Sequence, residues 1–341
     1  MLRHLLTGPS AWTGPDLAPA TDGILHLSRA QLGEIESALR SVRLRGTPLL
    51  RVRPRDFPLP TLASELTRIA DALENGRGFA LIRGFPVDRY GPAAVSTLFW
   101  GLGLHLGVPV SQNAAGHLLG HVRDTGRSLN SASARGYQTR EHLPFHTDHC
   151  DLLGLLCVRA AGSGGQISLA ASASVHNGVL AQRPDLVDRL YRTHFVDRRE
   201  EHGPGERPYH AVPLAAWHAD RLSLRYHRRY LESAQRFPDV PRLEAADREL
   251  FDLIDALADS PQLRLDLDFA AGDLLLVNNH AVLHSRTAYE DSAEPALKRH
   301  VLRLWLTPHQ QRLLPPGFWD ESAAGRGRGG VAPRDVIGAA A

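Results

Sequence analysis

The N-terminal third of the chain shows the repeating apolar pattern of amphipathic helices. After Ser28, a residue type that often caps a helix, apolar residues recur every three or four positions. The same pattern runs over residues 62–73, where Asn75-Gly76 ends it, and again over residues 93–106. Between these two, the apolar run at residues 78–86 predicts a short buried strand.

From residue 108 onward, short apolar runs alternate with turn residues, which is typical of β-strands. Helical patterns interrupt this series at residues 174–191, 230–236 and 244–258. Helices followed by many short strands predict one mainly β domain of the sandwich or barrel kind, with helical insertions (α+β). The predicted strands cover residues 118–122, 145–148, 152–158, 166–171, 209–213, 222–226, 263–269, 274–277 and 299–307.

Composition narrows the class of protein without identifying it. The 39 Lys and Arg residues nearly balance the 37 Asp and Glu residues, so we expect no nucleic-acid partner. No apolar run is long enough to cross a membrane, and Pro9 interrupts the N-terminus before a signal peptide could form. Cys150 and Cys157 show neither metal spacing nor a disulfide framework, which favours a reducing, cytoplasmic location. We expect a small-molecule substrate; the oligomeric state, a homo-oligomer included, stays open.

Candidate metal ligands occur within the stretch from His142 to Asp151. If the predicted strand at residues 145–148 is extended, His146 and Asp148 point to the same face, because residues two apart do so in a strand. One nitrogen and one oxygen ligand are two-thirds of the 2-His-1-carboxylate triad that binds Fe(II). Alone, the pair is equally compatible with a surface His and Asp. The best candidate for the third ligand is His284, which taken alone would more often be structural.

The last predicted strand carries two arginines on one face. Arg299, Val301, Arg303 and Trp305 share that face, whereas the opposite face is mostly leucine and is expected to pack on the core or a covering helix. Charged groups are rarely buried without partners, and a guanidinium binds a carboxylate with two parallel hydrogen bonds. Arg299 and Arg303 therefore indicate a bound carboxylate, with a buried ion pair to Asp or Glu as the alternative.

These residues together resemble a known family. His146-x-Asp148, the distal His284 and the Arg299-x-x-x-Arg303 pair are similar to the iron(II)/2-oxoglutarate-dependent dioxygenases of the taurine dioxygenase-like (TauD/TfdA) superfamily, and also to its clavaminate synthase-like branch. The resemblance covers roughly residues 78–315 and implies a double-stranded β-helix (jelly-roll) core. We predict a helical or irregular segment at residues 1–77, an oxygenase domain at 78–322 and a mobile tail at 323–341.

The resemblance implies a role for each matching residue. His146, Asp148 and His284 would bind Fe(II), Arg299 would bind the C5 carboxylate of the co-substrate 2-oxoglutarate, and O2 would be the oxidant. Ser168 would add a hydroxyl to that carboxylate, and Arg303 would line the substrate side or form a structural pair. Asn113 is a second substrate-side candidate, although a plain turn residue is the favoured interpretation.

The implied reaction is hydroxylation of an unactivated C–H bond in a small molecule, amino-acid-like or a specialised metabolite of biosynthesis. Amino-acid hydroxylases of the clavaminate branch usually carry Glu at the position of Asp148, which weakens the transfer of a free amino-acid substrate. Desaturation and cyclisation stay open, as does substrate identity. The alternatives are a metal-dependent hydrolase and a non-enzymatic jelly-roll binding protein. The basic run at residues 225–230 could face an acidic substrate, but a solvated basic face is favoured.

Overall fold

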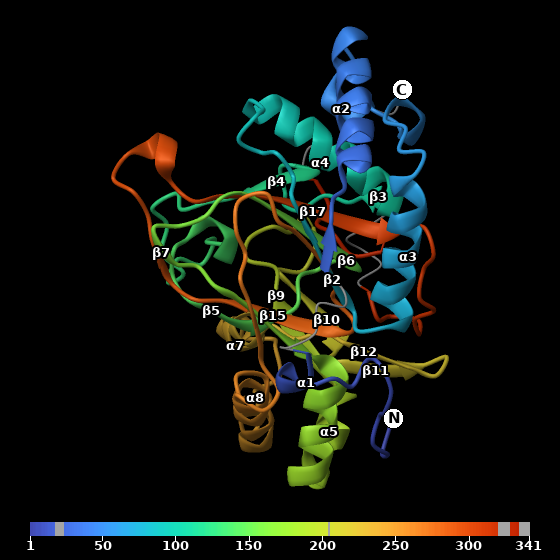
Figure 1. Cartoon of the computed structure of the whole chain (residues 1–341). Coiled ribbons are helices and arrows are strands. Elements are labelled where there is room, and N and C mark those ends of the chain that lie inside the picture. The colour runs from blue at the N-terminus through green and yellow to red at the C-terminus, as the bar shows by residue number, and fades with distance from the viewer. Residues whose placement is uncertain (18–23, 204, 320–327, 334–341) are drawn as a thin grey trace.

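The computed structural model describes residues 1–17, 24–203, 205–319 and 328–333, and it shows two β-sheets stacked between two groups of helices (Figure 1). The larger sheet has seven strands, in the order β1 (Ile24–His26), β2 (Phe79–Arg83), β14 (Leu274–Asn278), β6 (Leu152–Arg159), β17 (His300–Pro308) and β3 (Gly107–Pro109), with β4 (Leu119–Val122) also paired to β17.

The smaller sheet has four strands, and three two-stranded ribbons accompany it. Its order is β13 (Leu265–Leu267), β8 (Ile167–Ala171), β15 (Val282–Arg286) and β5 (Leu143–His146). The ribbons are β9 (Thr193–Asp197) with β10 (Tyr209–Pro213), β11 (Ala215–His218) with β12 (Arg221–Leu224), and β7 (Ser163–Gly164) with β16 (Tyr289–Glu290). The predicted mainly β architecture with helical insertions is confirmed.

Three N-terminal helices cover the outer face of the larger sheet (Figure 1). They are α2 (Arg29–Leu44), α3 (Leu62–Asn75) and α4 (Pro92–Leu106), and α1 (Gly14–Leu17) is a single turn before them. The predicted cap is present, because the Ser28 hydroxyl accepts the backbone N–H of Gln31 while the Gln31 side chain accepts that of Ser28. The leucine face of β17 packs against this helical layer, as predicted from its alternation.

The smaller sheet is covered on its outer side by α5 (Ser172–Gln182) and α8 (Ala245–Ala258), while α6 (Val187–Leu190) and α7 (Arg228–Ser233) are short (Figure 1). Apolar side chains of α5, α8 and β12 form one buried cluster with Leu283 of β15. The inner faces of the two sheets meet through Ile167, Val277 and Trp305. The β5 and β15 strands are therefore fixed from outside by helices and from inside by the opposing sheet.

Several predicted boundaries differ from the structure. The strands β9 and β11 were missed, because each is partly exposed and lacks a clear alternation, whereas their partners β10 and β12 were predicted. The segment before residue 78 contributes β1, which pairs in parallel with β2, and the division between residues 77 and 78 stays a prediction. The predicted mobile tail falls mostly on residues 323–327 and 334–341, which lie outside the described residues. Within the tail, Gly329 forms a β-bridge with Cys150.

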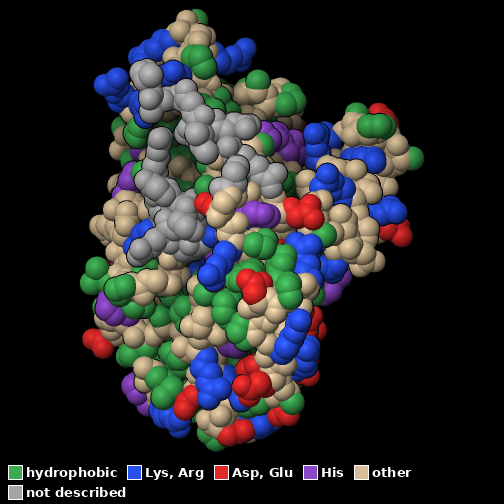
Figure 2. All heavy atoms as spheres, turned by 180° about the vertical axis from the view of Figure 1, so that it is seen from behind, with side chains coloured by type: hydrophobic (Ala, Val, Ile, Leu, Met, Phe, Trp, Pro, Cys, Tyr) green, Lys and Arg blue, Asp and Glu red, His purple; other side chains and the backbone are tan. Residues whose placement is uncertain are grey.

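The surface is of mixed charge on the face seen in Figure 2, where basic and acidic side chains are interspersed over the lower half of the molecule. Within the described ranges, none of the helices combines the length and the apolar character needed to cross a lipid bilayer.

Candidate metal centre

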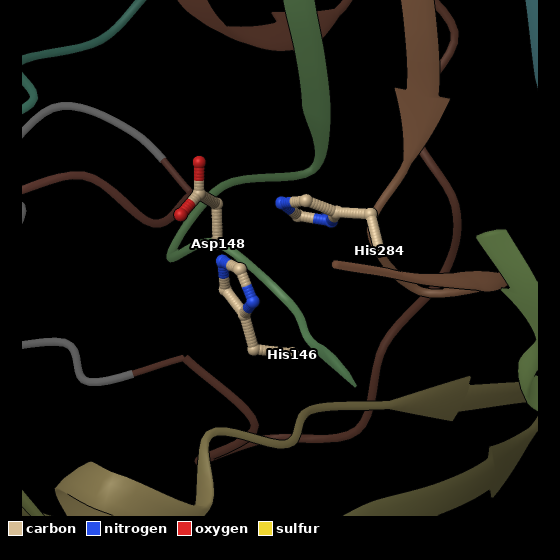
Figure 3. Close-up of side chains that lie close together, drawn as sticks. All are labelled: His146, Asp148 and His284. Atoms are coloured by element: carbon tan, nitrogen blue, oxygen red, sulfur yellow. The ribbon is translucent and has the colours of Figure 1, made fainter. Parts of the chain in front are cut away.

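Three metal-ligating side chains converge where β5 and β15 pair. His146 and His284 are direct antiparallel partners, so their side chains project from neighbouring positions on one face. Their ring centroids lie 4.3 Å apart. One ligand atom each from His146, Asp148 and His284 lies within 4.8 Å of the others. Figure 3 shows the two imidazoles and the carboxylate directed toward one common space.

Asp148 reaches this space from a turn. The prediction that the strand continues to Asp148 is wrong: β5 ends at His146, and the N–H of Thr147 donates to the Tyr226 carbonyl at 2.8 Å. The N–H of Asp148 donates to the Asn279 side-chain oxygen at 3.0 Å. The role of Asn279 was not predicted, because in the sequence Asn279 is only a typical turn residue after the strand β14. It holds the backbone that presents the carboxylate.

Burial sets the protonation state that a metal requires. Burial lowers the pKa of His284 to about 3 and also lowers the pKa of His146, so both imidazoles are neutral near pH 7. The Nδ1 of His146 lies 2.8 Å from the Pro144 carbonyl, which can only accept a hydrogen bond. Nδ1 therefore carries the proton, and the lone pair of His146 is on Nε2. A neutral imidazole with its tautomer fixed in this way is a metal ligand.

Asp148 stays ionised although it is buried. Burial alone would raise its pKa, but Arg303, His284 and His146 outweigh that effect and lower it well below the usual range. Arg303 Nη1 lies 3.3 Å and Trp305 Nε1 2.9 Å from the same oxygen, Oδ2. Oδ1 is thus the oxygen left for a metal. Arg303 is in turn held by the side chain of Gln112, whose Oε1 accepts from its Nε at 2.7 Å.

Both sheets line one cavity around these three residues. Apolar side chains line it on the larger-sheet side and on the adjoining part of β8, whereas a group of polar side chains lines other parts of it. The apolar group is Val122, Leu153, Leu155, Ile167 and Val301, and the polar group includes Arg135, His149, Arg225, His227 and Tyr230. The cavity therefore combines an apolar lining with a set of polar groups.

A second positively charged corner of the cavity is formed by Arg299 and Arg286. Arg299 is 4 % exposed, immediately before β17, and its guanidinium lies over the Tyr289 ring at 5.0 Å. Burial lowers its pKa. Arg286 lies over the same ring at 4.9 Å. It was missed in the sequence, although its position two residues after His284 on one strand predicts the same face.

Two predicted site residues lie away from the cavity. Ser168 points to the opposite face of β8 from Ile167, and its hydroxyl donates to Asp266 Oδ1 at 2.5 Å. The Asn113 side chain stays in its own turn, where it accepts the N–H of Ala115 at 3.1 Å. The turn interpretation of Asn113 agrees with these contacts. Arg303, by contrast, lines the cavity while paired with Asp148.

Some side chains of the basic run at residues 225–230 line the cavity, and others lie outside it. Arg225, His227 and Tyr230 line the cavity, and Arg225 is only 8 % exposed, so the favoured interpretation of a solvated basic face is wrong for this part. Arg228 instead pairs with Asp255 and Glu232. The ring of His227 stacks on Tyr230 with centroids 3.6 Å apart and lies 5.0 Å from that of His146. The run thus supplies one wall beside the three ligands.

Comparison with known families gives one match over most of the chain. The family model described as "Taurine catabolism dioxygenase TauD, TfdA family" matches residues 45–305. The chain is 30 % identical over 339 residues to FR-33289 synthase of Streptomyces rubellomurinus, covering 96 % of this chain and 98 % of that protein. It is 27 % identical over 328 residues to the taurine hydroxylase-like protein SAT17 of Stachybotrys chartarum, covering 93 % and 84 %.

Solved structures of similar fold include two oxygenases. Asparagine oxygenase, in complex with Fe(II), 3-hydroxyasparagine and succinate, has a TM-score of 0.66 at 16 % identity, covering 83 % of this chain and 93 % of that one. The non-heme iron oxygenase OrfP, in complex with Fe and alpha-ketoglutaric acid, has a TM-score of 0.61 at 20 % identity, with the same two coverages.

Proposed function

Because this chain belongs to the TauD, TfdA family of dioxygenases, we propose that His146, Asp148 and His284 bind one Fe(II) ion and that Arg299 binds the distal carboxylate of 2-oxoglutarate. The family predicted from the sequence is confirmed. So are the double-stranded β-helix core and the assignment as an Fe(II)/2-oxoglutarate-dependent dioxygenase.

The observation that carries the residue assignment is the three ligands and the arginine corner in one cavity. Two neutral imidazoles and one carboxylate are the donor set of non-heme Fe(II) oxygenases, and they leave positions open for a co-substrate and O2. A zinc hydrolase could use the same three ligands, but it has no need for a buried guanidinium such as Arg299 beside them. The donor set and the charge of the corner therefore fit Fe(II) and a dicarboxylate together.

When bound, Fe(II), 2-oxoglutarate and O2 would supply the oxidising chemistry, with 2-oxoglutarate converted to succinate and CO2 as the substrate is oxidised. The chain's own residues position and protect the site. Arg303 and Trp305 hold Oδ2 of Asp148, so Oδ1 is the oxygen that would bind Fe(II). The Pro144 carbonyl fixes the His146 tautomer, and the apolar wall limits access of water.

The substrate is proposed to be a small molecule whose unactivated C–H bond is hydroxylated. The products named in two structural neighbours, hydroxyasparagine and hydroxyarginine, favour an amino-acid-like compound. Asp148, where amino-acid hydroxylases of the clavaminate synthase-like branch usually carry Glu, weakens the transfer of a free amino acid as the substrate. Arg135 and Tyr230 also line the cavity, and both can donate hydrogen bonds, which favours a substrate with hydrogen-bond acceptors. Two buried free thiols, Cys150 and Cys157, support a reducing, cytoplasmic setting.

Metal removal tests the proposed function. In air, the purified protein with Fe(II) and ascorbate is expected to convert 2-oxoglutarate to succinate slowly even without substrate. Chelation should stop succinate formation, Fe(II) should restore it, and Zn(II) should not, because Zn(II) has no redox chemistry. Succinate measured by mass spectrometry checks this. No succinate from the Fe(II)-loaded protein would contradict the oxygenase and favour the hydrolase or the binding protein.

A further inference from the structure

At one corner of the cavity, four buried donor atoms from three residues have no hydrogen-bond partner among the described residues. They are Nε and Nη1 of Arg286, Nη1 of Arg299 and the hydroxyl of Tyr289. Their residues are 5 %, 4 % and 4 % exposed. A buried donor without a partner costs free energy, and a charged one costs more. Such an arrangement persists only if a ligand supplies the missing acceptors, or if other interactions in the fold offset this free-energy cost.

The corner gathers positive charge rather than balancing it. Both guanidiniums lie over the Tyr289 ring, at 4.9 Å for Arg286 and 5.0 Å for Arg299, and both line the cavity that contains the three metal ligands. Neither guanidinium forms an ion pair with a carboxylate of the described residues. The side chain of Asp291 is close: its Oδ1 accepts the backbone N–H of Arg299 at 2.7 Å, and its buried Oδ2 has no hydrogen-bond partner among the described residues.

Main-chain carbonyls fix the direction of Arg286. Its Nη2 donates to the carbonyl of Thr139 at 2.9 Å and to that of Glu141. The other two nitrogens, Nε and Nη1, have no partner among the described residues, and they donate in different directions because Nη1 is cis to Cδ and the Nε proton is not. Because Arg286 follows His284 by two residues on β15, both side chains project from the same strand face. Arg286 is therefore held rigidly beside the metal ligands with an unused pair of donors.

We propose that Arg286 is a second binding residue for the distal carboxylate of 2-oxoglutarate, so that Arg286 and Arg299 hold this carboxylate together. A carboxylate offers about four acceptor positions, enough for two guanidiniums. Ser168, the hydroxyl first expected there, is turned away toward Asp266. In this proposal Arg286, and not the hydroxyl of Ser168, is the second donor to the carboxylate. The inference rests on the proposed function, because it assigns residues to the co-substrate of that reaction.

Calorimetric titration of Fe(II)-loaded protein under anaerobic conditions tests the proposal without turnover. Arg286→Lys is expected to raise the Kd for 2-oxoglutarate by about tenfold, the effect of losing one charge-assisted hydrogen bond. For 2-oxopentanoate, which lacks the distal carboxylate, the Kd should be the same in the wild type and the variant. Arg286→Gln, which keeps an amide donor for the Thr139 carbonyl, should behave like Arg286→Lys.

The matched control is Arg83→Lys. Arg83 donates to the main-chain carbonyl of Asp268 at 3.0 Å and lies outside the cavity, so its variant should keep the wild-type Kd. The proposal is overturned if both Arg286 variants bind 2-oxoglutarate like the wild type, or if they weaken the binding of both ligands equally. Failure of the proposed function looks different: the Fe(II)-loaded wild type itself would not bind 2-oxoglutarate.

Discussion

Replacing Asp148 with alanine is expected to abolish Fe(II) binding and to reduce succinate formation by more than about 100-fold. Mutating a residue that only hydrogen-bonds to a metal ligand already lowers metal affinity or activity by up to about 100-fold, and Asp148 would be a ligand itself. The variant should also lose stability. Arg303, which is 6 % exposed, would keep a buried charge without its carboxylate, and breaking a buried pair in this way costs about 3–5 kcal/mol. Metal content and thermal unfolding measure the two effects separately.

Two asparagine variants separate metal loss from misfolding. Asp148→Asn keeps an oxygen that can accept from Trp305 and Arg303 but removes the charge, so it should lose Fe(II) while losing less stability than Asp148→Ala. Asp266→Asn is the matched control, because Asp266 accepts a hydrogen bond from Ser168 on the opposite face of β8. It should keep its metal and its activity. Wild-type Fe(II) affinity in Asp148→Asn would exclude Asp148 as a ligand.

Replacing Arg299 with glutamine is expected to change stability and binding in opposite directions. The Kd for 2-oxoglutarate should rise by about 100-fold, since two charge-assisted hydrogen bonds of roughly 1.5 kcal/mol each are lost. The ligand-free protein should melt at a higher temperature. The substitution removes a buried cation whose Nη1 has no partner among the described residues and whose pKa is lowered by burial. Replacing a functional residue that destabilises the ligand-free protein often raises the stability of the folded state at the expense of activity.

Thermal melting with and without 2-oxoglutarate measures both effects. The Fe(II)-loaded wild type should gain about 2.7 kcal/mol of stability when 2-oxoglutarate is present at about 100 times its Kd. Arg299→Gln should gain little at that concentration, and Arg83→Gln should gain as much as the wild type. An Arg299 variant that is stabilised by 2-oxoglutarate as strongly as the wild type would remove Arg299 from the co-substrate site.

The period of the apolar pattern was enough to predict most of the elements and the face of β17 that enters the cavity. The α2 cap at Ser28, the α8 helix and the leucine face of β17 all agree with local sequence rules. The strands β9 and β11 could not be predicted from local sequence rules, because they pair as separate two-stranded ribbons and show no clear alternation of apolar and polar residues. Their partners β10 and β12 follow them closely in the chain, so these strands are defined by this pairing and not by an apolar pattern.

For the site, the sequence indicates the three candidate ligands that the fold brings together, and Arg299, but not the residues that support them. The two histidines are neighbours because β5 and β15 pair in one register, which no local pattern specifies. Asp148 is presented by a turn held by Asn279, a contact between residues 131 positions apart. Ser168 was placed one residue out of phase with Ile167, the residue that faces the cavity. A one-residue shift in a strand reverses the face.

The central claim is that one cavity binds Fe(II) through His146, Asp148 and His284 and chelates 2-oxoglutarate beside it. The most direct measurement is the visible absorption spectrum of the protein mixed anaerobically with Fe(II) and 2-oxoglutarate. The account predicts a weak metal-to-ligand charge-transfer band in the wild type, absent in His146→Ala and Asp148→Asn. At low co-substrate concentration the band should also be weaker in Arg299→Gln. A folded wild-type protein that shows no band under these conditions would contradict the account.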